Sequence, residues 1–118
     1  MLTWLIAAAA AIPAAETANL AADHDLRCAA AISVVAGASA GNLTPQQKAS
    51  TTIAMVYYVG KVDGARPGLD YAEAFKAVAA SADFRANFRD EALRCMQQES
   101  ERARSLRETT RALQATGN

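Results

Sequence analysis

The 118-residue sequence has one histidine, two cysteines and no net charge, and each shortage excludes a class of function. His24 alone cannot form the spaced histidine set of a metal site, and no nucleophile motif or glycine-rich phosphate loop accompanies it. Twelve basic and twelve acidic residues create no net field that would favour nucleic acid or anionic lipid. We therefore expect no metal, no cofactor, no nucleic-acid partner and no enzymatic activity.

Prolines and glycines are also few, with three and six respectively, whereas 30 residues are alanine. This composition favours helices strongly over strands. Because alanine buries only one methyl group, the core should be thin for a chain of this length. We predict an all-α fold, a small orthogonal or bundle-like domain of about four helices that is closed by one disulfide.

Residues 1–15 form an apolar block that is too short to cross a bilayer as a helix. It predicts a cleaved secretory leader ending between residues 15 and 18, although no Lys or Arg precedes the apolar run. The alternative is a retained apolar helix, which would anchor the protein or pack on the domain. After removal of the leader, a single domain would occupy residues 16–118, in the periplasm or outside the cell, without stable membrane insertion.

The two cysteines are predicted to form a disulfide. Cys28 shares a helix face with Ile32 and Val35, and Cys95 lies in an apolar stripe, so both should point into the core. An oxidising compartment would pair them, since they lack further ligands for zinc. The functional alternative is a redox-active thiol, which usually needs a Cys-x-x-Cys motif or a neighbouring base. Neither is apparent in the sequence, and His24 is predicted to be solvated.

Capping residues mark where four helices should begin. The first of these helices should end at Gly41–Asn42, a typical left-handed C-terminal signal. The last helix becomes strongly charged beyond Met96, and 19 of the 24 charged residues follow Gly60. The predicted starts are Asp23 or Asp25, Thr44 with Pro45 and Gln47, Asp70 with Glu73, and Ser81 or Asp83.

Residues 55–64 are the most distinctive stretch, with two adjacent tyrosines and glycines spaced by four. Apolar residues lie on both faces of the predicted helix, so we expect it to be the central helix of the core. Gly60 would allow close approach of a neighbouring helix and Gly64 would cap the C-terminus. The predicted core-packing residues are Ile53, Val56, Tyr57, Gly60, Phe75, Phe84 and Phe88. The exposed end of this helix supplies a candidate binding surface of Tyr58, Lys61, Asp63 and Arg66.

The order of these features resembles the small periplasmic acid-stress chaperones of the HdeA type. The shared features are a leader, a Cys soon after it, a central apolar helix, a loop through Leu69–Asp70 and a second Cys in a charged segment. That family's aromatic and acidic residues around the first Cys are replaced here by Leu26–Ala30, so no functional residue carries over. The spacing of Tyr58–Gly60 and Asp63–Gly64 is also similar to that of small disulfide-bonded immunity proteins of the Rap1a type.

These resemblances imply a non-enzymatic exported protein that binds a protein partner or client, as an acid-stress chaperone or an envelope accessory. Full protonation of its carboxylates would leave a net charge of about +13 on the chain, and self-repulsion would open apolar surface. An immunity-type protein is one alternative, and a homodimer is compatible with each of these functions. Another alternative is a small-ligand carrier or enzyme that uses a polar site within Tyr57–Gly64.

Overall fold

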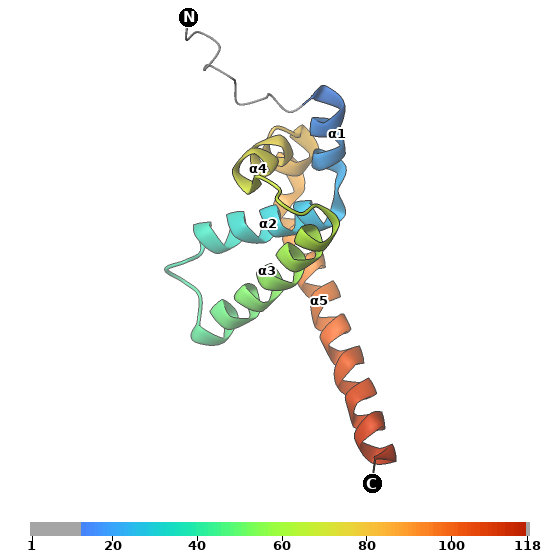
Figure 1. Cartoon of the computed structure of the whole chain (residues 1–118). Coiled ribbons are helices and arrows are strands. Elements are labelled where there is room, and N and C mark those ends of the chain that lie inside the picture. Colours follow the sequence, from blue (N-terminus) through green and yellow to red (C-terminus); the bar gives the residue numbers. More distant parts are fainter. Residues whose placement is uncertain (1–12, 118) are drawn as a thin grey trace, which may run out of the picture.

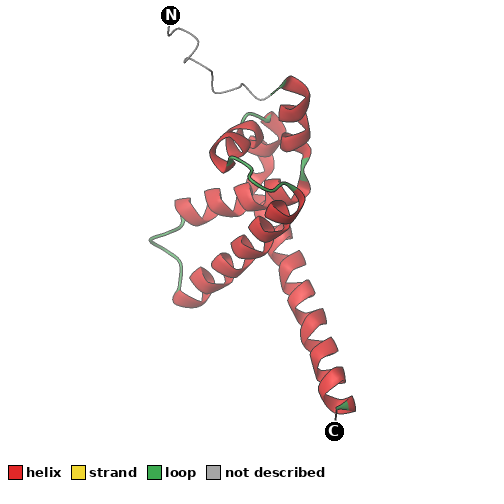
Figure 2. Ribbon diagram, viewed as in Figure 1, coloured by secondary structure: helices red, strands yellow, loops and turns green. Residues whose placement is uncertain are grey.

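The computed structural model describes residues 13–117, in which five helices and no strand are found (Figure 2). The all-α prediction is therefore confirmed, with one helix more than expected. The helices are α1 (Ala14–Ala22), α2 (His24–Ala38), α3 (Pro45–Ala65), α4 (Tyr71–Ala79) and α5 (Ala82–Thr116).

The additional helix α1 covers residues that were predicted to end the leader and to precede the first helix of the domain. Its Leu20 is only 1% exposed, and the helix packs mainly on α4. The interval proposed for leader cleavage, residues 15–18, lies within α1. The remainder of the predicted leader, up to residue 12, lies outside the described residues.

Capping residues start four helices where the sequence predicts them. The side chains of Asp23, Thr44, Asp70 and Ser81 each accept a hydrogen bond from a backbone N–H in the first turn. Thr44 and Gln47 form the complete reciprocal capping box. The predicted helix ends are less accurate, because α2 ends at Ala38 and α3 continues through Gly64 to Ala65. Gly64 is therefore not a C-cap, and the positive φ of 74° in the next turn belongs to Gly68.

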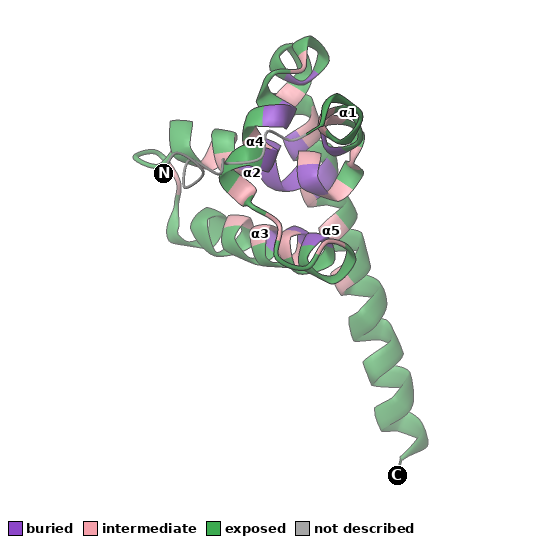
Figure 3. Cartoon of the chain, turned by 45° about the horizontal axis from the view of Figure 1, so that its top comes forward, coloured by how far each residue is buried: buried purple, intermediate pink, exposed green. Residues whose placement is uncertain are grey.

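The central helix is α2, which contacts all four of the other helices (Figure 1). Six of the sixteen buried hydrophobic residues lie on it, three of them consecutive alanines at 29–31. Small side chains on several sides of a helix let its neighbours approach closely. The prediction that residues 55–64 form the central helix was therefore wrong. Figure 3 shows the buried residues gathered around α2, whereas most of α3 is exposed.

Helix α3 packs through one face, which carries Ala54, Tyr58 and Val62. Ile53 and Val56 are 58% and 67% exposed, so their assignment to the core was wrong. The apolar pattern offers two faces, and the structure buries the one that carries Tyr58. Gly60 also serves no close packing, because a Cβ atom at this position would meet no atom within 4 Å.

Replacing Gly60 by alanine should therefore stabilise the protein. Glycine inside a helix costs about 0.5–1 kcal/mol relative to alanine. We expect the thermal midpoint of Gly60→Ala to rise by about 2–6 °C. Gly68→Ala is the matched control and should lower the midpoint, because alanine tolerates the positive φ of Gly68 poorly. A lower midpoint for Gly60→Ala would show that another part of the chain packs against this position.

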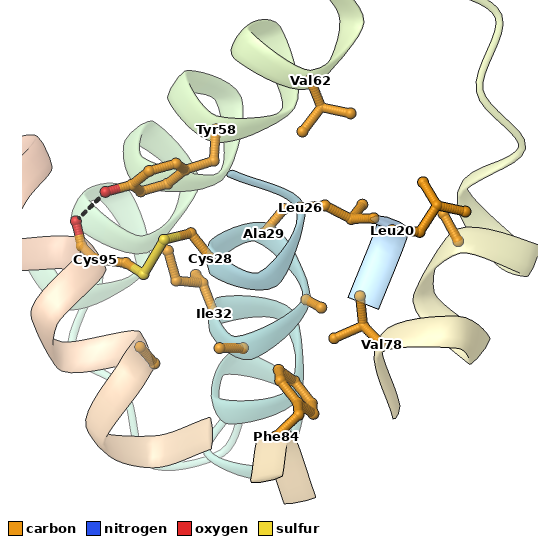
Figure 4. Packing of buried hydrophobic residues seen from close by; sticks show 14 of the residues in the cluster. Leu20, Leu26, Cys28, Ala29, Ile32, Tyr58, Val62, Val78, Phe84 and Cys95 are labelled. Carbon is orange, nitrogen blue, oxygen red and sulfur yellow. Dashed lines mark hydrogen bonds between the residues drawn. A yellow bond between two sulfur atoms is a disulfide. The ribbon is translucent and has the colours of Figure 1, made fainter. Parts of the chain in front are cut away.

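The remaining core predictions agree with the structure. Phe84 is 3% exposed, while Tyr57, Phe75 and Phe88 are partly buried and pack against the core. Cys28 and Cys95 are disulfide-bonded, with Cα atoms 5.6 Å apart, as predicted (Figure 4). The bond joins α2 to the first half of α5. The second half of α5 extends away from the domain, and every residue from Arg104 to Gly117 is exposed (Figure 1).

Candidate functional site

The four residues of the predicted binding surface do not form one site. Tyr58 is 1% exposed, and its hydroxyl donates a hydrogen bond of 2.5 Å to the backbone carbonyl of Cys95 (Figure 4). Burial raises the pKa of Tyr58 to about 12. Of the two adjacent tyrosines, Tyr58 points inward and Tyr57 lies half-buried at the side. The prediction that Tyr58 is exposed was therefore wrong.

The other three residues contact separate partners. Lys61 Nζ lies 3.1 Å from Asp25 Oδ1, and this hydrogen bond raises the pKa of Lys61. Asp63 accepts a hydrogen bond from the hydroxyl of Tyr71 on α4. Burial, followed by this contact with Asp63, raises the pKa of Tyr71 to about 12. These contacts connect helices.

Arg66, the fourth residue of the predicted binding surface, contacts the start of α2. Its Nε lies 3.4 Å from Asp23 Oδ2. Five concavities on the described part of the chain have linings that include no residue of Tyr57–Gly64, although Arg66 lines one of them beside Leu20 and Leu69. The predicted polar site at the end of α3 is thus a group of structural contacts.

Polar contacts concentrate instead at the first turn of α2, and Arg27 makes most of them. Its guanidinium donates to both carboxylate oxygens of Glu91, to Asp83 at 3.0 Å and to the carbonyl of Ala21 at 3.0 Å. Its side chain is 14% exposed and lies over the ring of Phe84. The hydrogen bond to Glu91 is the main reason why the pKa of Arg27 is raised. Arg27 thus joins α1, α2 and α5.

His24 lies beside this arginine, and it is not merely solvated as the sequence suggested. Its Nε2 is 3.1 Å from Gln98 Oε1 and 3.6 Å from the sulfur of Cys28. Its ring also stands edge-on to that of Tyr58, with centroids 6.4 Å apart. A concavity of about 370 Å³ opens here, which we call the polar pocket. It is lined by Ala22, His24, Arg27, Asp83, Glu91, Arg94, Cys95 and Gln98.

Two signals in the sequence could have indicated these residues. Arg27 is the only Lys or Arg among the first 47 residues, and it stands next to a cysteine in an apolar helix. His24 and Cys28 are four residues apart, a spacing that brings side chains together on a helix. The partners on α5 carry no comparable signal, because charged residues are frequent there.

Two further concavities each carry an exposed large apolar side chain. The first, which we call the α2–α5 groove, is lined by Val35, Ala38, Ser39, Phe88, Arg89, Ala92, Leu93 and Met96. The second, the α3–α5 wedge, is lined by Ser50, Ile53, Met96, Glu99, Ser100, Ala103 and Arg107. Met96 lines both, so the two concavities meet on α5. Leu93 in the groove is 62% exposed, and Ile53 in the wedge is 58% exposed.

Within residues 13–117 there is no cluster of three or more His, Cys, Asp or Glu side chains that could bind a metal ion. No helix in this range combines the length and the apolar character that crossing a membrane requires. The Cys28–Cys95 disulfide indicates an oxidising environment outside the cytoplasm. Comparisons with protein-family models, with curated proteins and with solved structures gave no match to this chain.

Proposed function

We propose that this protein acts by binding other proteins after export to the periplasm or the cell exterior. An apolar segment of the partner would lie in the α2–α5 groove and the α3–α5 wedge. The observation that carries the proposal is the meeting of these two concavities at Met96, with Leu93 and Ile53 exposed beside them. Contiguous exposed apolar surface on a small domain is typical of a protein-interaction site.

The charges around the two concavities indicate which partner fits at neutral pH. Arg89 lines the groove and Arg107 lines the wedge, where Glu99 is the only acidic residue. The exposed end of α5 adds Arg104 and Arg111. An apolar segment with acidic flanking residues complements this surface. Such a segment becomes available in a partly unfolded client protein.

The ion pairs support a chaperone that responds to acid. Four of the five ion pairs in the described chain join residues 23–27 to α5, to α3 or to Arg66, which directly follows α3. Each depends on a carboxylate, from Asp23, Asp25, Asp83 or Glu91, and protonation removes the charge that the pair requires. Acid would therefore loosen the contacts around the first turn of α2, while the disulfide continues to join α2 and α5. The groove and the wedge would become more accessible to a client.

Suppression of client aggregation tests the proposal. A client enzyme is denatured at neutral pH by heat, and in parallel at about pH 3, with increasing amounts of the full-length protein. We expect the wild type to keep the client soluble, more effectively in acid. The double variant Ile53→Ser/Leu93→Ser should need at least about fivefold more protein for the same protection, because two apolar contacts with the client are lost.

Leu113→Ser is the matched control, because Leu113 is 67% exposed but lies outside both concavities. This variant should protect the client within about twofold of the wild type. Client binding as a chaperone would be rejected if the wild type gave no protection at either pH. Equal losses in both variants would show that the groove and the wedge are not the binding site.

The alternative of a polar ligand site within Tyr57–Gly64 is not part of this proposal. Tyr58 fills the space between α3 and Cys95, and Asp63 is engaged by Tyr71. The HdeA-like and immunity-type alternatives both involve a protein partner. They differ in that a chaperone protects many clients, whereas an immunity protein binds one partner tightly.

A further inference from the structure

The two sulfur atoms of the disulfide have different surroundings. Cys28 is 0% exposed, but His24, one turn earlier on α2, places Nε2 3.6 Å from its sulfur. Cys95 is 3% exposed and lines the polar pocket, which is open to solvent. An imidazole beside one cysteine and an opening beside the other make this bond asymmetric.

The hydrogen bonding of His24 places a proton near Cys28. Gln98 Oε1 is a hydrogen-bond acceptor that lies 3.1 Å from His24 Nε2, and this contact favours the form of His24 in which Nε2 carries a hydrogen. The same N–H is within reach of the Cys28 sulfur. A thiolate that forms at Cys28 would therefore meet a proton donor already in position.

The charges of the polar pocket suit an anionic nucleophile. Asp83 and Glu91 line it, but both are paired with Arg27. Arg94 also lines the pocket and forms no ion pair within 4 Å with any residue in the described range. Since the thiolate is the attacking form of a thiol, a basic group near Cys95 favours its approach.

We propose that Cys28–Cys95 is an exchangeable disulfide that a thiol opens through the polar pocket. The incoming thiolate forms a new S–S bond with Cys95, and the Cys28–Cys95 bond breaks with its electron pair going to the Cys28 sulfur. The imidazolium form of His24 gives its Nε2 proton to that sulfur and is left as neutral imidazole. A second thiolate then attacks the reductant's sulfur in the mixed disulfide and releases Cys95 as a thiolate, which takes a proton from water. Two thiols of the reductant are thereby oxidised to a disulfide, and the protein disulfide is reduced to two thiols.

The position of the mixed disulfide tests this mechanism. The oxidised full-length protein is treated with reduced glutathione in native buffer, quenched with acid and N-ethylmaleimide, and analysed by peptide mass spectrometry. We expect glutathione on Cys95 and N-ethylmaleimide on Cys28, with at least about fivefold preference over the reverse. The rate should rise with glutathione concentration, as direct attack on the folded protein requires.

The variant His24→Gln removes the proton donor at an exposed position. We expect its rate of mixed-disulfide formation to fall at least about tenfold and its preference for Cys95 to decrease, because the leaving sulfur loses its acid. Gln97→Ala is the control, since Gln97 neighbours Gln98 but does not line the polar pocket. This variant should react at the wild-type rate.

Three outcomes would overturn the inference. A reduction rate that equals the unfolding rate and does not depend on glutathione concentration would show that the bond opens only in the unfolded chain. Glutathione found equally on both cysteines, or mainly on Cys28, would contradict the direction of attack. An unchanged rate and product distribution in His24→Gln would remove the role of His24. The measurement does not involve client binding, so its outcome is independent of the proposed function.

Discussion

Reduction of the Cys28–Cys95 disulfide is expected to lower the free energy of unfolding by about 4 kcal/mol. The two cysteines are 67 positions apart, and a bridge over such a loop reduces the conformational entropy of the unfolded chain by about this amount. A domain of this size has a total stability on the order of 5–15 kcal/mol. Since alanines make up much of the core around α2, we expect the reduced protein to be near the lower limit of stability.

Urea unfolding followed by circular dichroism measures this effect. The oxidised protein, the reduced protein and the double variant Cys28→Ala/Cys95→Ala are compared at neutral pH. The reduced protein and the double variant should share a midpoint well below that of the oxidised protein. Coincident midpoints for all three would mean that the packing of α2 on α5 already determines stability without the bond.

Tyr58→Ala is expected to destabilise the protein by about 3–5 kcal/mol, the range found when a large aromatic residue is removed from a core. Tyr58 is the largest fully buried side chain, and it lies between α3 and Cys95. Tyr58→Phe keeps the ring and removes only the hydroxyl, so it should cost about 1 kcal/mol. Val56→Ala, at an exposed position two residues earlier on α3, should leave the urea midpoint nearly unchanged.

The same tyrosine makes stability depend on alkaline pH. Its pKa is raised to about 12 in the folded protein, above the value near 10 of an unfolded tyrosine. The folded state therefore holds the proton of Tyr58 more tightly than the unfolded state does. The resulting contribution to the free energy of unfolding is fully present below about pH 10 and is lost as the pH rises through 12. Stability should fall over this interval, and it should fall less in Tyr58→Phe. An equal decline in both proteins would assign the effect to other groups, such as Tyr71.

Local signals in the sequence predicted helix starts well. A capping side chain acts within one turn, so Asp23, Thr44, Asp70 and Ser81 can be recognised without knowledge of the fold. The disulfide was also predictable, because both cysteines lie on apolar helix faces. Helix ends were less predictable, since Gly41 and Gly64 could each have supplied a left-handed cap that the chain does not use.

The choice of central helix depends on tertiary packing, which the sequence pattern does not determine. Within residues 53–62, apolar side chains lie on both faces of the helix. This pattern alone favours the helix for the centre of the core. The structure instead places α2 there, because its small side chains admit neighbours on several sides. Only the fold decides that Tyr58 turns inward and Val56 outward, since Tyr58 finds a hydrogen-bond acceptor at Cys95.

The candidate functional residues were missed for a similar reason. Arg27 and His24 acquire their roles from partners on α5 that are more than 50 residues away, Glu91 and Gln98. Leu93 lies away from the apolar stripe of α5 that carries Cys95, so the sequence pattern assigns it no role. Its exposure is significant only because the end of α2 forms the other wall of the groove.

The position of the disulfide also determines how the molecule would respond to mechanical force. The bond joins α2 to α5 and encloses α3 and α4 in a covalent loop. Tension applied to the two ends of the chain would pass from α2 through the sulfur atoms into α5. The enclosed helices could unfold without lengthening the path between the ends. Only cleavage of the bond would release the loop, adding about 220 Å of extended chain.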